Sequence, residues 1–477
     1  MRLRASSVNR PARVADPEQS RREFLSTVTD AIDCWHGLLR PDVELTPQFA
    51  GQFTADLRAA HLFFGHRIHC PFLRPFFLDD EQVALVREVS ETIARMGEIV
   101  AHAGLERPDV DDAVALTDEE KSLVSIDPGY TRASTASRLD SFILPDSLQF
   151  AEYNAESPAG LGYTDTLAAE FERLEVLSRF RERFEARPFS LMSPMLDALL
   201  ASYKDFGGTE APPTIAIVDW REVPTWPEFE MLQAHFRSLG VPTIVCDPRE
   251  LQFKSHVLSH EGTKIDLVYR RVLINDILSR PEDCKALTDA YAARAVCVAN
   301  TFRCKIPHKK AFFAVLTDDR FASLFDPADL AVARKHVPWT RLISEGATHR
   351  GDTDIDLVPH IRAHRETLVM KPNDEYGGVG VTLGWECSAA EWDHALGKAL
   401  GGALGAWVVQ ERIHVRREPF PKFEAGQGAK IGDMLVDCAP YLFRGRLAGF
   451  LTRLSATGLA NVTSGGGQVP SFVVKAR

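Results

Sequence analysis

The sequence predicts a mixed α/β fold with α+β elements. Three patterns predict it: helical spacing of apolar residues in the first 120 residues, a strand–helix–strand alternation after residue 212, and later apolar strands that end in polar residues. A chain of 477 residues, 45% of them apolar, is long enough for about three domains. We place the segment boundaries at 1–120, 121–205, 206–300 and 301–477.

The first segment, residues 1–120, is predicted to be a helical N-terminal region. Apolar residues recur every three or four positions in Ser20–Ile32 and in Asp80–Ile93, as on the buried face of a helix. Four potential metal ligands lie between these stretches: His61, His66, His69 and Cys70. Neighbouring aromatic residues and Pro71 favour a packed, irregular junction over a metal site.

A hairpin with acidic and amide side chains is predicted in the second segment. Residues Ser141–Ala151 have the pattern of strand, turn and strand, which would bring Asp140 near Glu152. Glu152 and Asn154 are two apart and therefore share one face of a strand. Two carboxylates and an amide oxygen are hard ligands that suit Mg²⁺, and Arg138 beside them could hold a phosphate that is being transferred. The alternative is a charged hairpin with solvated ends.

A βαβ unit is predicted in the third segment, with strands at 213–219 and 242–247 and a helix at 226–240. This alternation predicts a parallel sheet. The unit contains no GxGxxG motif, so the sequence does not imply that it binds a dinucleotide. Arg270 and Arg271 end a later strand of this sheet. Ligands bind outside the carboxyl ends of such strands, so either arginine could meet an anionic substrate, and a surface salt bridge is the alternative.

The fourth segment contains an apolar strand that ends in Lys371, a loop with three glycines (Gly377, Gly378 and Gly380) and a second apolar strand. Glycines let backbone N–H groups approach phosphate oxygens, and the lysine adds a charge at the same place. We therefore predict a flap over phosphates, with an ordinary Gly-rich hairpin as the alternative. The later strand that ends in Gln410 and Glu411 suits a linker that hydrogen-bonds an adenine edge.

Together these segments resemble the circularly permuted branch of the ATP-grasp superfamily, which includes glutathionylspermidine synthetases. In that branch an Arg-x-Asp segment and a Glu-Tyr-Asn-Ala segment precede the nucleotide-binding lysines, and this chain has the same order. Glu156 stands where the family has Asp, Lys310 matches a family lysine, and Lys309 replaces an asparagine. The resemblance implies a Rossmann-like pre-ATP-grasp domain at 206–300, between the metal-ligand part and the nucleotide-binding part of the ATP-grasp module.

The resemblance also implies an activity, that of an ADP-forming carboxylate–amine ligase acting through an acyl phosphate. ATP and two Mg²⁺ ions would be required, and the acid and the amine would be small molecules or peptides. Lys310 and Lys371 would hold phosphates, while Arg138 would stabilise the transferred group. A phosphotransferase or a nucleotide-binding scaffold without turnover is the alternative. Glutathione and spermidine do not transfer from the resemblance to this chain.

A second set of metal ligands is available near the C-terminus. Asp437 and Asn461 match the metal pair of ordinary ATP-grasp enzymes, and we rank them second because the upstream set is more complete. Residues 433–455 are similar to the family's strand, turn and strand ending in an arginine, here Arg453. After it, Ser464–Gly467 could form an anion-binding nest or a simple turn.

Composition excludes several classes of partner. A net charge of −11 argues against nucleic acid or an anionic membrane as the main partner. No apolar run approaches the roughly 18 residues of a membrane span. The basic N-terminus has no apolar segment after it, and the eight cysteines include no C-x-x-C pair, so we expect reduced thiols in a cytoplasmic protein. The sequence gives no indication of oligomeric state.

Overall fold

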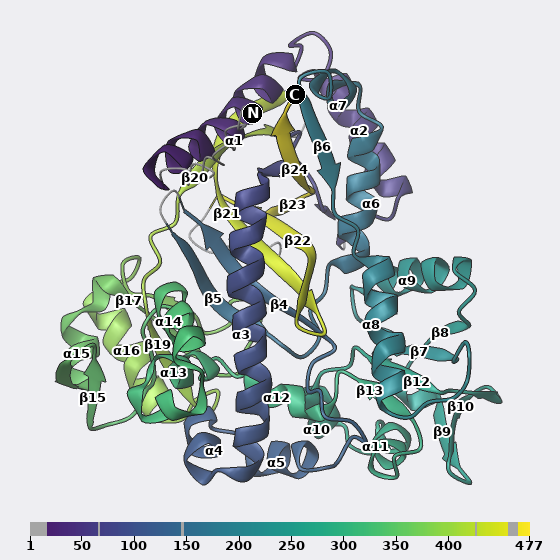
Figure 1. Ribbon diagram of the computed structural model, residues 1–477, viewed down its shortest axis with the longest axis vertical. Helices are drawn as coiled ribbons and strands as arrows, with labels where there is room; N and C mark the ends of the chain where they lie inside the picture. Colours follow the sequence, from purple (N-terminus) through teal and green to yellow (C-terminus); the bar gives the residue numbers. More distant parts are fainter. Residues whose placement is uncertain (1–16, 65–66, 145–146, 425–426, 457–465) are drawn as a thin grey trace, which may run out of the picture.

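The computed structural model describes residues 17–64, 67–144, 147–424, 427–456 and 466–477. It confirms a mixed α/β fold with several sheets (Figure 1). Asn461, Ser464 and Gly465 of the second predicted ligand set lie outside the described residues, as do His66 and the basic N-terminus. In the described part, no helix combines the length and the apolar character that crossing a bilayer requires.

The largest sheet joins the predicted hairpin to the C-terminal part of the chain. Its strand order is β23-β22-β21-β4-β5, and β20 also pairs with β21. The bounds are β4 (Ala136–Ile143), β5 (Leu148–Asn154), β20 (Arg417–Phe423), β21 (Ala429–Phe443), β22 (Arg446–Ser455) and β23 (Gly467–Val469). Strand β21 lies antiparallel to β4, with Tyr441 opposite Arg138. Residues about 300 positions apart in the sequence therefore meet on one face.

The predicted βαβ unit is present. Strands β7 (Ile215–Val218) and β8 (Thr243–Cys246) are parallel neighbours joined through α9 (Trp226–Ser238). With β12 (Leu267–Arg270) and β13 (Cys297–Ala299) they form a four-stranded sheet, order β13-β12-β7-β8. Helices α8 (Met192–Asp205), α10 (Ile274–Ser279) and α11 (Lys285–Ala292) accompany it, as does a small sheet of β9 (Leu251–Lys254), β10 (Val257–His260) and β11 (Thr263–Lys264) that the sequence analysis did not predict.

The predicted flap belongs to a third sheet, order β14-β19-β17-β18. Its strands are β14 (Thr340–Leu342), β17 (Leu368–Pro372), β18 (Thr382–Leu383) and β19 (Trp407–Glu411). Strands β17 and β18 pair antiparallel across the glycine loop, as expected for a strand–loop–strand flap, although β18 has only two residues. Near this sheet lie α13 (Phe312–Thr317), α14 (Pro327–His336), α15 (Leu357–Ala363), α16 (Ala389–Leu400) and the pair β15 (Ala347–Arg350) and β16 (Thr353–Asp356), while α12 (Lys305–His308) contacts β5 and α13.

The N-terminal region contains long helices, as predicted, but also strands that the helical interpretation missed. Helix α3 (Asp80–Glu106) begins with a capping box between Asp79 and Gln82 and packs on the large sheet. Figure 1 shows its lower end between the third sheet and the parallel sheet. The other helices of this region are α1 (Pro17–Leu38), α2 (Pro47–Ala59), α4 (Pro108–Val114) and α5 (Asp118–Val124), and α6 (Leu161–Glu172) and α7 (Glu175–Phe180) follow the β4–β5 hairpin. The missed strands are β1 (Phe63–Phe64), β2 (Arg67–Ile68) and β3 (Phe76–Leu78), and β3 pairs with β24 (Ser471–Ala476), which also pairs with β6 (Phe184–Pro188).

Candidate functional site

Two adjoining cavities lie where the large sheet meets the flap. Cavity A has a volume of about 410 Å³, and cavity B has a volume of about 300 Å³. The two share Glu152, Tyr376, Gly377 and Arg453 in their walls. The predicted site residues that line cavity A are Asp140, Glu152, Lys310, Lys371, Gly377, Gly378, Gln410 and Glu411. Arg138 and Asn154 line cavity B, and Gly380 lines neither.

The predicted metal ligands converge through the register of the β4–β5 hairpin. The sequence predicted that the hairpin would bring Asp140 near Glu152, and the two are direct cross-strand partners. The Asn154 amide nitrogen donates to Asp140 Oδ1 and to Glu152 Oε1, at 3.2 Å in each case. Burial opposes ionisation of Glu152, but the Lys310 and Lys371 ammonium groups outweigh it and hold the pKa of this carboxyl well below its usual value. Glu152 is therefore a carboxylate at neutral pH.

Arg453 and Asp437 complete this cluster, and the sequence analysis did not include them in the site. Arg453 Nη2 donates to Asp140 Oδ2 at 2.5 Å, and its Nε donates to Asp437 Oδ2 at 2.7 Å. The Ser141 backbone N–H donates to Asp437 Oδ1 at 3.1 Å, which fixes the hairpin to β21. Burial raises the pKa of Asp437 to about 7 although Arg453 opposes the shift. Asp437 is thus a neighbour of Asp140, whereas the sequence analysis treated it as belonging to a rival site.

Arg138 lies on the other side of Asp140. Its Nε donates to Asp140 Oδ1 at 3.2 Å, and its Nη1 donates to the Ala159 carbonyl at 2.9 Å. The guanidinium carbon lies 5.8 Å from the centre of the Tyr441 ring. One carboxylate therefore holds two arginines; Arg453 lines both cavities, whereas Arg138 lines cavity B.

Two lysines connect the flap to the acidic cluster. Lys371 Nζ donates to Gln410 Oε1 at 2.8 Å and to the Ala151 carbonyl at 3.2 Å. Burial lowers the pKa of Lys371 to about 8. Lys310 Nζ donates to the Glu375 carbonyl in the flap at 2.6 Å and lies 3.4 Å from Glu152 Oε2. Both ammonium groups thus lie between the flap and the carboxylates.

The three flap glycines all have positive φ angles, from 67° at Gly377 to 81° at Gly378. Gly380 has a further reason to be glycine, because an added Cβ would lie 2.6 Å from Pro372 Cγ. Its role is to let the flap fold back on β17.

The predicted adenine linker is the end of β19. The Gln410 amide bridges Lys371 and Thr340, since its Nε2 donates to Thr340 Oγ1 at 3.1 Å. Glu411 pairs with Arg350 at the mouth of cavity A. The Gln410 side chain therefore orients a cavity lysine.

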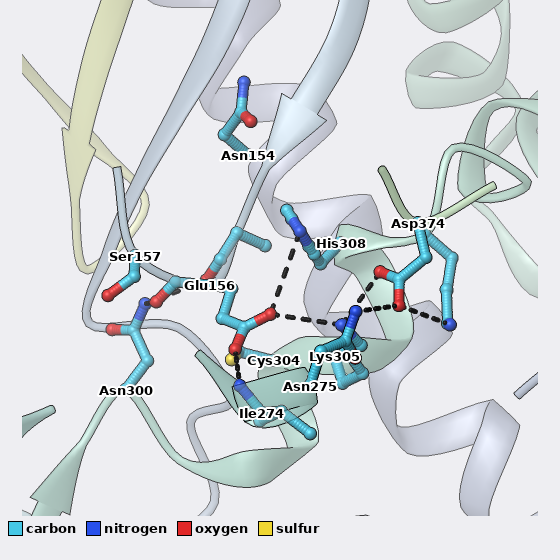
Figure 2. Close-up of polar contacts among 12 residues, drawn as sticks. Asn154, Glu156, Ser157, Ile274, Asn275, Asn300, Cys304, Lys305, His308 and Asp374 are labelled. Carbon is cyan, nitrogen blue, oxygen red and sulfur yellow. Dashed lines mark hydrogen bonds and ion pairs between the residues drawn. The ribbon is translucent and has the colours of Figure 1, made fainter. Parts of the chain in front are cut away.

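A buried network of charges ties the flap loop to other segments (Figure 2). Lys305 Nζ lies 2.8 Å from Asp374 Oδ1 in the flap loop, 3.3 Å from Glu156 Oε2 and 3.7 Å from Glu120 Oε1. Lys309 Nζ pairs with Glu120 at 2.7 Å and with Asp374 at 3.0 Å. Since these lysines are fully occupied by carboxylates, they have a structural role.

Arg270 and Arg271 correct the sequence analysis, which expected a substrate contact or a surface salt bridge. Arg270 is completely buried and pairs with Glu156 at 3.2 Å. Arg271 is also buried and donates to the Pro158 carbonyl at 2.8 Å. Both arginines therefore hold the 156–158 segment from behind, because this sheet is covered at its carboxyl end by that segment.

Asp140, Glu152 and Asn154 are the candidate Mg²⁺ ligands of this cluster. Within the described ranges, no group of three or more His, Cys, Asp and Glu side chains is arranged to hold an ion. Mg²⁺ usually takes one or two carboxylates together with substrate phosphates, so an all-protein cage is not required. Two carboxylates and an amide at Asp140, Glu152 and Asn154 fit this pattern. His69 is buried against Tyr163, with ring centroids 4.3 Å apart, as the packed-junction interpretation predicted.

Comparisons with known proteins were made for the whole chain. No protein-family model matches it. No curated protein matches it either. Among solved structures it is similar to a glutathione synthetase-like effector from Globodera pallida, with a TM-score of 0.60 and 10% identity over 91% of this chain and 98% of that chain. The two proteins share a fold.

A second solved structure is the provisionally named gamma-glutamylcysteine synthetase from Methylobacillus flagellatus KT. Its TM-score is 0.40 at 10% identity, with 77% of this chain and 83% of that chain covered. This similarity is too low to carry an argument.

Proposed function

We propose that this protein is an ADP-forming carboxylate–amine ligase with an ATP-grasp-like fold of permuted order. The observation that carries the proposal is cavity A, in which two lysines and a glycine flap face the acidic side chains of Asp140 and Glu152. That combination suits a nucleotide whose phosphates are held by cations and backbone N–H groups. Similarity in fold to a glutathione synthetase-like protein supports the same class.

The nucleotide would lie in cavity A with its phosphates toward the carboxylates. Lys310 and Lys371 supply charge to the phosphates, and the flap around Gly377 and Gly378 covers them. The end of β19 at Gln410 and Glu411 lies at the base end. Asp140, Glu152 and Asn154 would hold two Mg²⁺ ions, with Asp437 beside them. Bound there, Mg²⁺ would neutralise the charge that develops on the phosphate oxygens.

The reaction needs an activated acid, because a carboxylate is a poor electrophile. A carboxylate oxygen of the acid attacks the γ-phosphorus of ATP, ADP leaves, and an acyl phosphate forms. A neutral amine then attacks the acyl carbon, so that an amide forms, inorganic phosphate leaves and a proton is released. Arg138 and Arg453 would stabilise the charge on the transferred phosphoryl group and on the tetrahedral intermediate.

One incubation distinguishes this proposal from its alternatives. The protein is mixed with Mg²⁺, ATP and a panel of amino acids, small peptides and polyamines, and the products are quantified. A ligase gives ADP, phosphate and a new amide in equal amounts. A phosphotransferase gives ADP and a phosphorylated acceptor without free phosphate. A scaffold forms none of these products. Either of the last two results contradicts the proposal.

Replacing Lys371 with Met is expected to weaken nucleotide binding. A charge-assisted hydrogen bond to phosphate contributes about 1.5–3 kcal/mol, so the Kd should rise by about 10- to 100-fold. Isothermal titration calorimetry with a non-hydrolysable ATP analogue and Mg²⁺ measures it. Because burial lowers the pKa of Lys371 to about 8, its positive charge is lost as pH rises through that value, and wild-type affinity should fall above pH 8.

The matched control for this prediction is Lys398→Met, which removes an exposed lysine of α16 outside both cavities. Its affinity should equal that of the wild type. The Lys371→Met variant should also lack most of the decline above pH 8. An unchanged Kd in Lys371→Met would show that the flap is not part of the nucleotide site.

Replacing Arg138 with Ala is expected to lower kcat by about 10²–10³-fold with little change in KM for ATP. The reason is that its guanidinium meets the full charge of the phosphoryl group only in the transition state. Arg138→Lys should rescue little, because lysine lacks the planar fork. Arg453→Ala should behave similarly, since Arg453 lines both cavities.

Arg446→Ala, which removes an exposed arginine of β22, serves as the control for both variants. If Arg138→Ala keeps its kcat at saturating Mg²⁺ and only binds the metal more weakly, Arg138 is a support for Asp140 and has no catalytic role.

A further inference from the structure

Cavity B has buried polar side chains in its wall whose hydrogen-bonding groups lack partners. His69 is 5% exposed and Tyr163 is 2% exposed, and both line this cavity. Among the described residues, neither ring nitrogen of His69 nor the Tyr163 hydroxyl makes a hydrogen bond. The Phe63 backbone approaches the His69 ring and the Glu228 backbone approaches the Tyr163 hydroxyl, but neither contact meets hydrogen-bond geometry. Buried polar groups normally have partners, so these two groups indicate a ligand.

A third such group lies in the wall of cavity B. His308 Nδ1 is buried without a hydrogen-bond partner, while its Nε2 lies 3.8 Å from Glu156 Oε2 (Figure 2). Burial lowers the pKa of both His69 and His308 to about 4, so both rings are neutral at pH 7. Neutral imidazoles and a hydroxyl offer one donor and one acceptor each, but no charge.

Cavity B also has charged groups in its wall. Arg138, Arg453 and Glu152 line it, and Arg453 and Glu152 line cavity A as well. These groups carry both signs, which suits the carboxylate and the ammonium of a zwitterion. A volume of about 300 Å³ lies at the lower limit for ligand pockets and fits a molecule of amino-acid size.

We propose that cavity B binds the acid substrate, and that this substrate is an α-amino acid whose side chain ends in an uncharged hydrogen-bonding group. The α-carboxylate and α-ammonium contact Arg138, Arg453 and Glu152, and the side chain contacts His69 and Tyr163. A charged side chain is disfavoured because the His69 imidazole and the Tyr163 hydroxyl offer it no counter-ion. An apolar side chain leaves the buried polar groups unpaired. This inference rests on the proposed ligase function for its assignment as substrate.

Four amino acids of similar length test the side-chain preference: L-glutamine, L-glutamate, L-lysine and L-norleucine. Each is titrated by calorimetry into the full-length protein saturated with Mg²⁺ and a non-hydrolysable ATP analogue. L-Glutamine should bind at least about tenfold more tightly than the other three. Equal or tighter binding of a charged or apolar member, or no binding by any of them, overturns the proposal.

Two variants test whether cavity B is the site at which the amino acid binds. Tyr163→Phe and His69→Phe should each reduce the preference for glutamine over norleucine by about fivefold, because each removes hydrogen-bonding groups. Tyr163→Phe should not lower the thermal unfolding temperature, since the hydroxyl it removes has no partner. The control is Tyr203→Phe, whose hydroxyl lies outside both cavities and accepts from the Glu210 N–H. A preference that is unchanged in both cavity variants overturns the assignment of cavity B.

The same titrations separate this inference from the ligase proposal. If the nucleotide analogue binds but the amino acids show no preference, the inference fails and the ligase proposal stands. If glutamine binds with the expected preference but no acceptor panel yields ADP, phosphate and an amide, the ligase proposal fails and cavity B remains an amino-acid site.

Discussion

Replacing Asp140 with Asn is expected to reduce Mg²⁺-dependent turnover by about 10³-fold. Asp140 accepts hydrogen bonds from Arg138, Arg453 and Asn154 and lies opposite Glu152, so it is the centre of the cluster. Asn keeps the size of the side chain but removes the charge that a hard cation requires. The rate of ADP formation as a function of Mg²⁺ concentration measures the loss, with a similar result expected for Glu152→Gln.

Asp433→Asn is the matched control, because Asp433 lies on β21 four residues before Asp437 but is exposed to solvent. It should retain full activity. Near-normal turnover in both Asp140→Asn and Glu152→Gln would contradict our assignment and would make Asp437 the principal acidic ligand.

Replacing Lys305 with Met is expected to destabilise the fold by about 3–5 kcal/mol. Lys305 is 1% exposed, and three carboxylates surround its ammonium group: Glu120, Glu156 and Asp374. Without that ammonium group, the buried carboxylates repel one another. They also lose part of the positive charge that offsets the cost of burying them. Chemical denaturation of the apo protein measures the change in the free energy of unfolding.

Lys285→Met provides the comparison, since Lys285 forms an exposed pair with Asp289 one helical turn away. It should lower the free energy of unfolding far less than Lys305→Met does, because an exposed ion pair contributes little. Lys305 and Arg270 hold the pKa of Glu156 at about 2, despite burial, which acts to raise it. The associated stability is present above the unfolded-state pKa of about 4.3 and is lost as pH falls toward 2, and Lys305→Met should move this loss to higher pH. A variant as stable as Lys285→Met would show that the network contributes little.

Several features of the site were predictable because they depend on neighbouring residues. The β4–β5 hairpin is local, so the spacing of Asp140 and Glu152 predicted that they would lie near each other, and the structure pairs them directly. The same holds for the β7–α9–β8 unit and for the glycine flap between β17 and β18, where periodicity and turn residues determine the element. These contacts join elements that adjoin in sequence.

Which side chains are buried, and which distant strands pair, was decided by the tertiary structure. The sequence places Arg270 at a strand end but does not say that the 156–158 segment covers it, and so the expected surface or substrate contact was wrong. The strands β1, β2 and β3 were missed because short strands have no periodic pattern of their own, and β3 is defined by its pairing with β24 at the other end of the chain.

By itself, therefore, the sequence determined the residue types of the proposed phosphate and metal site and the local elements that carry them. Only the tertiary structure decided that Asp437 and Arg453 join Asp140, because the register between β21 and β4 links residues about 300 positions apart. It likewise decided that His69, Tyr163 and His308 line one cavity, since each comes from a different segment. Such convergence depends on how sheets and helices pack, and packing free energy is shared among contacts that no local pattern specifies.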